Sequence, residues 1–374
     1  MIPTSAALPS GSRRLRRLVA PAIARAGATP GADRYRKHFP ASAHLWLLVL
    51  HGLGAAPSLR QGFAVLSAVP DLFARLGLRQ GLSFSQLARS TSSRPGACFE
   101  ALLADLVAQA RRTVVPDASW RAMRHVLLLD STFLPLSLAL SPWCRTGGAE
   151  PGVRLQAGLE LARALPRHLD LTRLATNDRA ALAALDLTPW RGWTVLVDLG
   201  YYGHRQFRRL HGAGVSFLSR LHPQASYRVT AGRVVATRPT PEGDVVLSDQ
   251  TVTLGSPNNR AGAVLPGLRL IRSRNRRGRE QAFVTDRFDL TAWELVRLYH
   301  YRWQIELFFR FVKRQLGMLA VLGRSRAAVW VTVLVGMVVA VLGLLLDAGR
   351  PPGVSRVAWL RGLGQTLLFA LPSG

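Results

Sequence analysis

Cysteine, lysine and acidic residues are all scarce in this 374-residue chain. The two cysteines, Cys98 and Cys144, are too few for a disulfide framework or for a zinc site built from several cysteines. Asp and Glu number 21 against 49 Lys and Arg, which gives a formal net charge of +28. A hydrophobic content of 48% excludes a disordered chain. The excess of positive charge predicts a polyanionic partner, and nucleic acid is the most common one.

Lysine is confined to two positions, Lys37 and Lys313, whereas arginine supplies every other residue of the Lys and Arg total. The compact ammonium of lysine and the planar guanidinium of arginine are not interchangeable as ligands. Because almost every other basic residue is arginine, we consider the two lysines candidate functional residues.

The first third of the chain predicts a basic arm followed by helices. Residues 1–32 are rich in Ala, Pro, Ser, Gly and Arg, and we expect a flexible basic arm there. Residues 33–115 show helical spacing of apolar residues, which predicts a helical domain. Within it, segments 83–90 and 93–108 each begin with a serine typical of a helix cap. They fit either a helix-turn-helix or a plain helical bundle.

Strand patterns begin after Pro116. Residues 125–130 and 193–198 are short apolar runs that each end in an aspartate, as is typical of strands buried on both faces. Residues 153–161 predict a further strand between them. From 215 to 286, β-branched runs alternate with turn residues, which indicates a β-rich segment.

One long apolar segment, residues 327–346, contains no charged residue. Its length of about 20 residues is what a membrane-spanning helix needs. A fully buried helix in a globular core has the same composition. We favour the buried helix and expect no membrane association, with a tail anchor as the membrane alternative.

Candidate catalytic groups lie at the two predicted strand ends and on one predicted helix. Asp130 and Asp198 end their strands, and ligands of α/β folds bind at the carboxyl ends of neighbouring strands. Either aspartate alone is better explained as a cap or turn residue, and the occurrence of both at equivalent strand ends weakens that explanation without removing it. Residues 291–316 predict a long helix that begins at Thr291. On this helix, one arc of about 60° carries four polar side chains, namely Tyr299, Arg302, Glu306 and Lys313.

The combination of acids and cations is suited to phosphodiester chemistry. Three converging carboxylates repel one another unless cations neutralise them. Divalent metal ions prefer such oxygen ligands, and two ions about 3.5–4 Å apart can activate a water and stabilise a leaving oxygen. Arg302 and Lys313 are suited to hold nearby phosphates. An ordinary solvent-exposed pair between Arg302 and Glu306, at i and i+4, is the simpler alternative.

These motifs resemble those of the DDE transposases of bacterial insertion sequences, in the subgroup with a Tyr-Arg-Glu-Lys signature. The similarity extends over roughly residues 35–347. It rests on Asp130-Ser-Thr, Asp198-x-Gly-Tyr-Tyr, the helix signature and, more weakly, Tyr35-Arg-Lys37-His-Phe and Ser58-Leu-Arg60.

The resemblance implies an α/β fold: a ribonuclease-H-like catalytic core with a β-rich insertion, preceded by an α-helical N-terminal domain. The expected division is 33–115 for the helical DNA-binding domain, 116–204 and 287–350 for the core, 205–286 for the insertion, and 351–374 for a C-terminal tail. Asp130, Asp198 and Glu306 are the implied catalytic residues and metal ligands, with two Mg²⁺ ions that Mn²⁺ can replace.

The resemblance also implies an activity and its partners. Tyr299, Arg302 and Lys313 are the implied DNA-binding residues. The family binds the inverted-repeat ends of its insertion sequence, cleaves DNA strands and transfers them to target DNA. It acts as a homodimer when bound to DNA, in the bacterial cytoplasm at the nucleoid.

Two alternatives and one departure accompany this interpretation. The chain is alternatively a catalytically inactive DNA-binding remnant of a transposase or a tail-anchored membrane protein. Some relatives use a tryptophan in the insertion to open a DNA hairpin, but no tryptophan occurs between Trp193 and Trp293. Phe217 and Tyr227 are the weaker candidates for that role.

Overall fold

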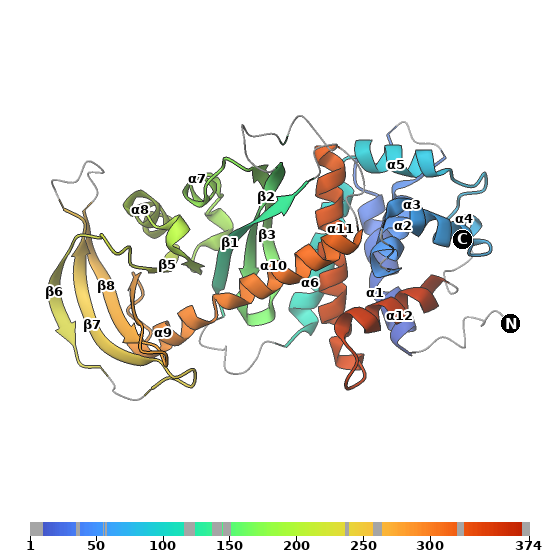
Figure 1. Ribbon diagram of the computed structural model, residues 1–374. Coiled ribbons are helices and arrows are strands. Elements are labelled where there is room, and N and C mark those ends of the chain that lie inside the picture. The colour runs from blue at the N-terminus through green and yellow to red at the C-terminus, as the bar shows by residue number, and fades with distance from the viewer. Residues whose placement is uncertain are drawn as a thin grey trace. The chain divides into compact units, whose positions relative to one another are not determined.

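The computed structural model describes residues 10–34, 38–54, 56, 58–115, 124–136, 144, 151–235, 239–256, 264–319 and 325–368 (Figure 1). Residues 1–9 of the predicted arm, Tyr35–Lys37 and the turn at residues 257–259 lie outside this part. The described chain forms two compact units. One comprises residues 1–115, 136–145 and 309–374, and the other residues 116–135 and 146–308.

The first unit is built from helices whose apolar faces pack on one another. Its helices are α1 (Ser10–Gly27), α2 (Ala41–Gly54), α3 (Leu59–Ser67), α4 (Leu72–Arg75), α5 (Phe84–Ser93), α6 (Ala97–Thr113), α11 (Arg326–Leu346), α12 (Arg356–Leu368) and the later part of α10 (Trp303–Leu319). Helix α6 lies against α11 and α1, and α2 lies against α12, α1 and α11. The unit is therefore a helical bundle closed by the last segments of the chain.

The predicted basic arm is wrong for residues 10–27, because they form helix α1. Leu15, Val19 and Ile23 repeat every four residues and are fully buried, which gives the helix an apolar stripe to pack with. Arg14 lies beside the stripe, and its guanidinium donates to the carbonyl of Leu345 at 3.0 Å. Composition suggested an arm, but the spacing of the apolar residues fixes a helix.

The capping signals near residue 83 are partly confirmed. Ser83 caps α5 in a capping box with Gln86. Helix α6 begins at Ala97 after Gly96, so the predicted start at residue 93 is wrong. Between the two helices, Arg94 is fully buried and donates to the carbonyls of Ala32 and Phe39. This arginine stabilises the bundle and is not available to nucleic acid.

The long apolar segment forms helix α11, the one described helix that is long and apolar enough to cross a membrane. The structure buries it among α6, α2 and α5. Val331, Met337 and Val341 are completely inaccessible to solvent. This burial is what the buried-helix interpretation predicted.

The second unit is a nine-stranded sheet in the order β3-β2-β1-β4-β5-β9-β8-β7-β6. Its strands are β1 (Val126–Pro135), β2 (Gly152–Glu160), β3 (Leu165–Arg173), β4 (Thr194–Val197), β5 (Ser216–Arg220), β6 (Tyr227–Arg233), β7 (Val245–Leu254), β8 (Leu265–Arg274) and β9 (Glu280–Thr285). Strands β1, β2 and β3 are antiparallel, and β4 and β5 run parallel to β1. This order and orientation are those of a ribonuclease-H-like core, as the sequence motifs implied.

Helices α7 (Asp178–Ala184) and α8 (His204–Gly212) pack on one face of this sheet. Leu182 and Phe207 from these helices share a buried cluster with Leu127, Val195 and Phe217 of the strands. Side chains alternate between the two faces of a strand, so Leu128 of β1 points the other way. Helix α9 (Ala292–His300) packs against β5, β7 and β8.

The division of the chain differs from the predicted one in two places. Strand β5 pairs with β4 in the core sheet, and helix α8 packs on that sheet. The antiparallel insertion therefore begins after Arg220 and not at residue 205. The strands of the insertion extend the same sheet, because β9 pairs with β5 and is followed by β8, β7 and β6. Residues from Phe309 to 350, predicted as core, and the predicted tail from 351 belong to the helical unit. Their apolar faces pack there, on α2 and α6.

Candidate active site

The pairing of two parallel strands brings Asp130 and Asp198 to the same level of the sheet. Strand β1 pairs with β4 in the register Val126 to Thr194 through Leu128 to Leu196. Continuing this register by two residues sets Asp130 opposite Asp198. Asp198 directly follows β4, as predicted, whereas Asp130 lies in the middle of the longer strand β1. Of the two predicted strand-end positions, only that of Asp198 is therefore observed.

A break in the predicted long helix shapes the other side of the site. Thr291 forms the expected cap, in a capping box with Glu294, but α9 ends at His300 and α10 begins at Trp303. At the break, the amide of Arg302 donates to the carbonyl of Tyr299 at 3.0 Å, a three-residue spacing tighter than that of an α-helix. Tyr299 and Glu306 thus belong to different helices, and a single helical arc does not describe them.

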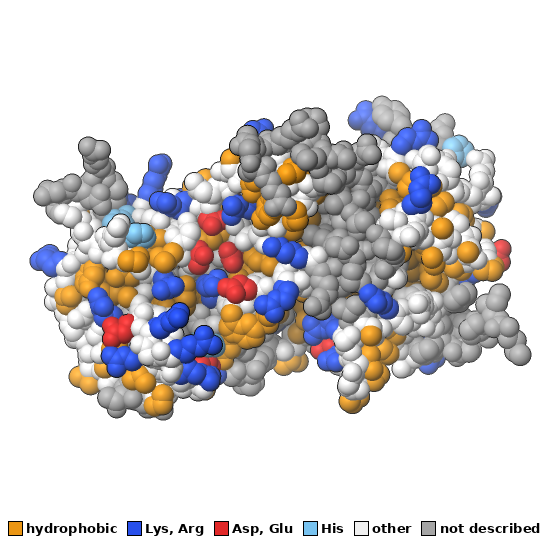
Figure 2. Space-filling view, in the orientation of Figure 1, with side chains coloured by type: hydrophobic (Ala, Val, Ile, Leu, Met, Phe, Trp, Pro, Cys, Tyr) orange, Lys and Arg blue, Asp and Glu red, His pale blue; other side chains and the backbone are white. Residues whose placement is uncertain are grey.

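Arg302 connects two of the three predicted carboxylates. Its Nη1 lies 3.6 Å from Oδ2 of Asp130, and its Nη2 donates to Oε1 of Glu306. The Asp130 side chain is 17% exposed and the Glu306 side chain 52% exposed. Figure 2 shows acidic side chains gathered beside β1 and the start of α10, with basic side chains around them. The guanidinium of Arg302 therefore lies between the carboxylates of Asp130 and Glu306.

The electrostatics of Asp130 indicate incompletely compensated negative charge. The pKa of its carboxyl is raised from 3.8 to about 6, mainly by burial and also by the nearby charges of Asp198 and Asp178. The Ser131 amide, which donates to Oδ1 of Asp130 at 2.8 Å, and the charge of Arg302 both act to lower this pKa. The net result is that the carboxylate form is disfavoured at this position.

The donor atoms have the chemistry that a hard divalent cation requires. Asp130 and Asp198 supply carboxylate oxygens, and their mutual repulsion is what a cation would relieve. Glu306 is held by Arg302, and in the described part of the chain no three acidic, histidine or cysteine side chains stand close enough to enclose a metal ion. The side chains are therefore of the type that binds such a cation, and Glu306 is paired with Arg302.

A fourth carboxylate, Asp178, stands beside the pair and was not predicted from the sequence. It is the first residue of α7, and its Oδ1 accepts a hydrogen bond of 2.6 Å from the Ser131 hydroxyl. Arg154 of β2 donates to the same hydroxyl at 2.9 Å and lies 3.6 Å from Asp178. Alternation along β1 explains the arrangement, because Asp130 and Ser131 must point to opposite faces.

The buried side chain of Tyr201 lies near Asp130, Asp178 and Asp198. The Tyr201 hydroxyl donates to Oε1 of Gln156 at 3.3 Å. Burial, and then the charges of Asp178, Asp130 and Asp198, raise its pKa, so the phenol stays neutral. It therefore adds no further negative charge to the site.

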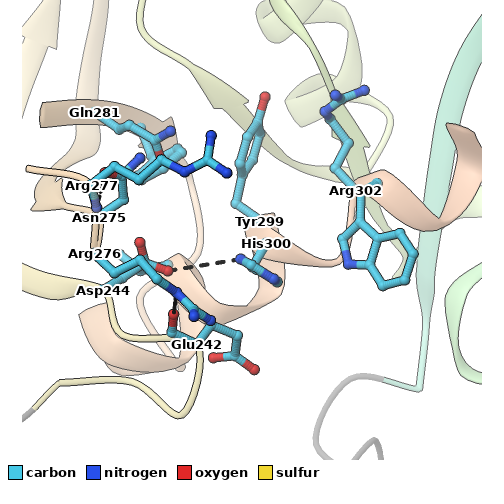
Figure 3. A pocket seen from close by; sticks show the side chains of 12 residues that line it. Glu242, Asp244, Asn275, Arg276, Arg277, Gln281, Tyr299, His300 and Arg302 are labelled. Carbon is cyan, nitrogen blue, oxygen red and sulfur yellow. Dashed lines mark hydrogen bonds and ion pairs between the residues drawn. The ribbon is translucent and has the colours of Figure 1, made fainter. Parts of the chain in front are cut away.

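A pocket of about 470 Å³ adjoins the site in the same unit (Figure 3). Tyr299 and Arg302 form part of its wall, with Arg277 of the β8–β9 turn pointing toward Tyr299. Burial raises the pKa of Tyr299 to about 12, and its hydroxyl has no hydrogen-bond partner among the described residues. Trp303, 43% exposed, contributes an aromatic surface. The other lining residues are Glu242, Asp244, Asn275, Arg276, Gln281, Phe283, Val296 and His300.

Three further predicted residues have different surroundings. Lys313 is exposed on α10, in the segment that belongs to the helical unit. Phe217 is fully buried and stacks on Phe207 at 4.2 Å, so it is not available to open a DNA hairpin. Tyr227 accepts a hydrogen bond from Arg272 at 2.7 Å.

Comparison with known proteins places these residues within a single family. The family described as the transposase DDE domain matches residues 121–342, which include the acidic group and the adjoining pocket. A Sinorhizobium fredii protein named as transposase y4zB is 29% identical over 67% of this chain and 68% of its own length. A Geobacillus stearothermophilus protein named as a transposase for insertion sequence element IS5377 is 24% identical over 66% of this chain and 63% of its own.

The similarity extends to solved structures, and one of them is described by its fold comparison. It is a cryo-EM structure of the piggyBac transposase synaptic complex with hairpin DNA. The similarity covers 94% of this chain and 77% of the other, with a TM-score of 0.47 and 9% identity.

Proposed function

The chain belongs to the transposase DDE domain family, and we propose that it binds the inverted-repeat ends of its own insertion sequence and carries out metal-dependent strand cleavage and transfer. The observation that carries the proposal is the register between β1 and β4, which sets Asp130 beside Asp198. Arg302 lies between Asp130 and Glu306 and contacts both, which supports a role for Glu306 as the third carboxylate.

We assign Asp130, Asp198 and Glu306 as the residues that hold divalent metal, Mg²⁺ or Mn²⁺. Two such ions would activate a water or a 3′-hydroxyl and stabilise the leaving oxygen of the phosphodiester. The three carboxylates bind and orient the ions. Arg302 partly offsets the charge of Asp130 and Glu306, and its guanidinium is suited to bind a DNA phosphate bidentately.

We assign Tyr299, Arg302 and Lys313, the Tyr-Arg-Lys part of the signature, to the transposon-end DNA. The pocket supports the assignment of Tyr299 and Arg302, because it combines the Tyr299 hydroxyl, which has no partner among the described residues, with the cation of Arg277 and the aromatic face of Trp303. Phosphate oxygens accept from such donors, and bases stack on exposed aromatic rings. The net charge of +28 supports the same partner.

The remaining parts of the proposal concern assembly and place. We propose that the helical unit contributes to DNA binding, that the protein acts as a homodimer on DNA, and that it works in the bacterial cytoplasm at the nucleoid. Target DNA is the second nucleic-acid partner.

Substitution of Glu306 by Gln tests the proposed chemistry. We expect Glu306→Gln to abolish Mg²⁺-dependent cleavage of DNA carrying the matched inverted repeats that flank the gene, because the amide cannot replace a metal-binding carboxylate. End binding in a gel-shift assay should remain. Glu280→Gln is the matched control, since Glu280 is also half-exposed and paired with an arginine, Arg274. Cleavage that is equal in both variants would contradict the mechanism.

A catalytically inactive remnant is the second candidate function. It predicts end binding that persists in EDTA and no cleavage by the unmodified protein with Mg²⁺ or Mn²⁺. The presence of Asp130, Asp198, Glu306 and Lys313 together favours the active enzyme.

A further inference from the structure

We propose that Asp178 is a positioning residue that sets the separation of the Asp130 and Asp198 carboxylates. The inference rests on the proposed function, because it concerns the same metal-binding carboxylates. It assigns a role to a residue outside the Asp-Asp-Glu set and outside the helix signature. Asp178 acts through two contacts, one to the strand that carries Asp130 and one to the turn that follows Asp198.

The first contact runs through Ser131. The Ser131 hydroxyl donates to Oδ1 of Asp178 at 2.6 Å, while the Ser131 amide donates to Oδ1 of Asp130 at 2.8 Å. One residue of β1 therefore holds a carboxylate on each face of the sheet. Arg154 fixes the hydroxyl from the neighbouring strand, donating to it at 2.9 Å. The side chain of Asp178 is 19% exposed, so water competes little for these bonds.

The second contact is a close approach at Gly200. The Gly200 amide donates to Oδ1 of Asp198 at 2.7 Å. A Cβ atom placed on Gly200 would lie 2.6 Å from Oδ2 of Asp178 and 3.0 Å from Oδ1 of Asp198. The space that a side chain at this position would fill thus lies between the two carboxylates. Helix α7 packs against the turn Leu199–Tyr201, which keeps Asp178 in this position.

A simpler role for Asp178 is an acid in the first turn of α7, where the helix dipole favours negative charge. That role does not require a bond to β1 or contact with the turn after Asp198.

The test measures Mn²⁺ affinity of the purified full chain by the electron paramagnetic resonance signal of free Mn²⁺, alongside the cleavage rate. We expect Asp178→Ala to weaken Mn²⁺ binding about 10–100-fold, the usual effect of removing a residue that orients metal ligands. Asp186→Ala is the matched control, an exposed aspartate shortly after α7 that bonds only within its own turn, to the Thr188 amide. It should bind Mn²⁺ like the unmodified protein.

Variants of Ser131 keep the test decisive if Asp178→Ala fails to fold. Ser131→Ala removes a single hydroxyl and should reproduce the loss of Mn²⁺ affinity, whereas Ser131→Thr restores the donor and should recover it. The double variant of Ser131→Ala with Asp178→Ala should lose no more than Asp178→Ala alone, because Asp178→Ala already removes the link through Ser131. A purely structural role in α7 would not couple these two residues through metal affinity.

The outcomes separate this inference from the function on which it rests. If Asp130→Asn weakens Mn²⁺ binding while Asp178→Ala and Ser131→Ala bind like Asp186→Ala, the positioning role is wrong and the metal site stands. If Asp130→Asn leaves Mn²⁺ affinity unchanged, the proposed metal site is wrong and the inference falls with it.

Discussion

Replacing Asp130 by Asn is expected to stabilise the metal-free protein at neutral pH while abolishing its activity. The carboxyl of Asp130 is buried beside Asp198 and Asp178, and its pKa is raised from 3.8 to about 6. At neutral pH the folded protein must therefore hold a charge that the unfolded chain holds more easily. Asparagine removes this charge and keeps the oxygen that accepts from the Ser131 amide.

The magnitude follows from the size of the pKa change. At about 1.4 kcal/mol per pKa unit, the raised pKa corresponds to about 3 kcal/mol of lost stability above pH 6. The side chain is 17% exposed, so solvent screening removes little of this value. The variant loses the attraction between Asp130 and Arg302 and must bury an amide. We therefore expect a net gain of about 1–3 kcal/mol.

The sign also defines a pH window. Between pH 3.8 and about 6 the folded protein binds more protons at Asp130 than the unfolded chain does, so its stability falls as the pH rises. The free energy of unfolding is measured by urea denaturation in EDTA at pH 7.5 and near pH 4. The advantage of Asp130→Asn should be present at pH 7.5 and largely lost near pH 4, where the folded carboxyl is protonated and the unfolded one is about half protonated.

Two results would refute this reasoning. A variant no more stable than the unmodified protein at pH 7.5 would mean that Asp130 is not electrostatically strained. A gain of equal size near pH 4 would mean that it arises from packing and not from charge. Asp186→Asn is the control, since the pKa of this exposed carboxyl is lowered by the Thr188 amide and its replacement should give no gain.

Two further substitutions test the insertion and the lysine. Asp249→Ala should destabilise the protein by about 3–5 kcal/mol in urea denaturation, because it leaves the guanidinium of Arg269, 4% exposed, without its carboxylate. Glu280→Ala, which breaks the exposed pair with Arg274, should cost about 0–1 kcal/mol, and equal losses would contradict the difference in burial. Lys313→Arg should slow strand cleavage more than it weakens end binding, because charge is kept while shape changes, and unchanged cleavage would show that the lysine is incidental.

Local signals in the sequence predicted much of the sheet. The apolar runs before Asp130 and Asp198 are strands, and the serine and threonine caps at Ser83 and Thr291 begin helices. These features depend on residues within one or two turns of each other, so sequence patterns contain them. The proximity of Asp130 and Asp198 was also predicted, and it follows from the parallel pairing of β1 with β4 although Asp130 lies within β1 and not at its end.

The features that were missed depend on tertiary contacts. The break between α9 and α10 contains neither proline nor glycine, and it occurs where Tyr299 is buried against Phe283, with ring centroids 4.7 Å apart. Asp178 is the first residue of the short helix α7, far along the chain from Ser131, and no local pattern relates the two residues. The membership of α11 in the helical unit follows from its packing partners, which its uniform apolar composition does not reveal.

The dependence of the site on strand register explains why these distant contacts matter. Asp130 and Ser131 are neighbours on β1, so they point to opposite faces of the sheet, one toward Arg302 and the other toward Asp178. A slip of β1 by one residue would exchange the two faces and place a hydroxyl where the carboxylate belongs. Burial of Leu127 with α7 and α8, and of Leu128 on the opposite face, makes such a slip costly. The apolar residues that precede the aspartate therefore determine its position as firmly as the polar residues that bind it.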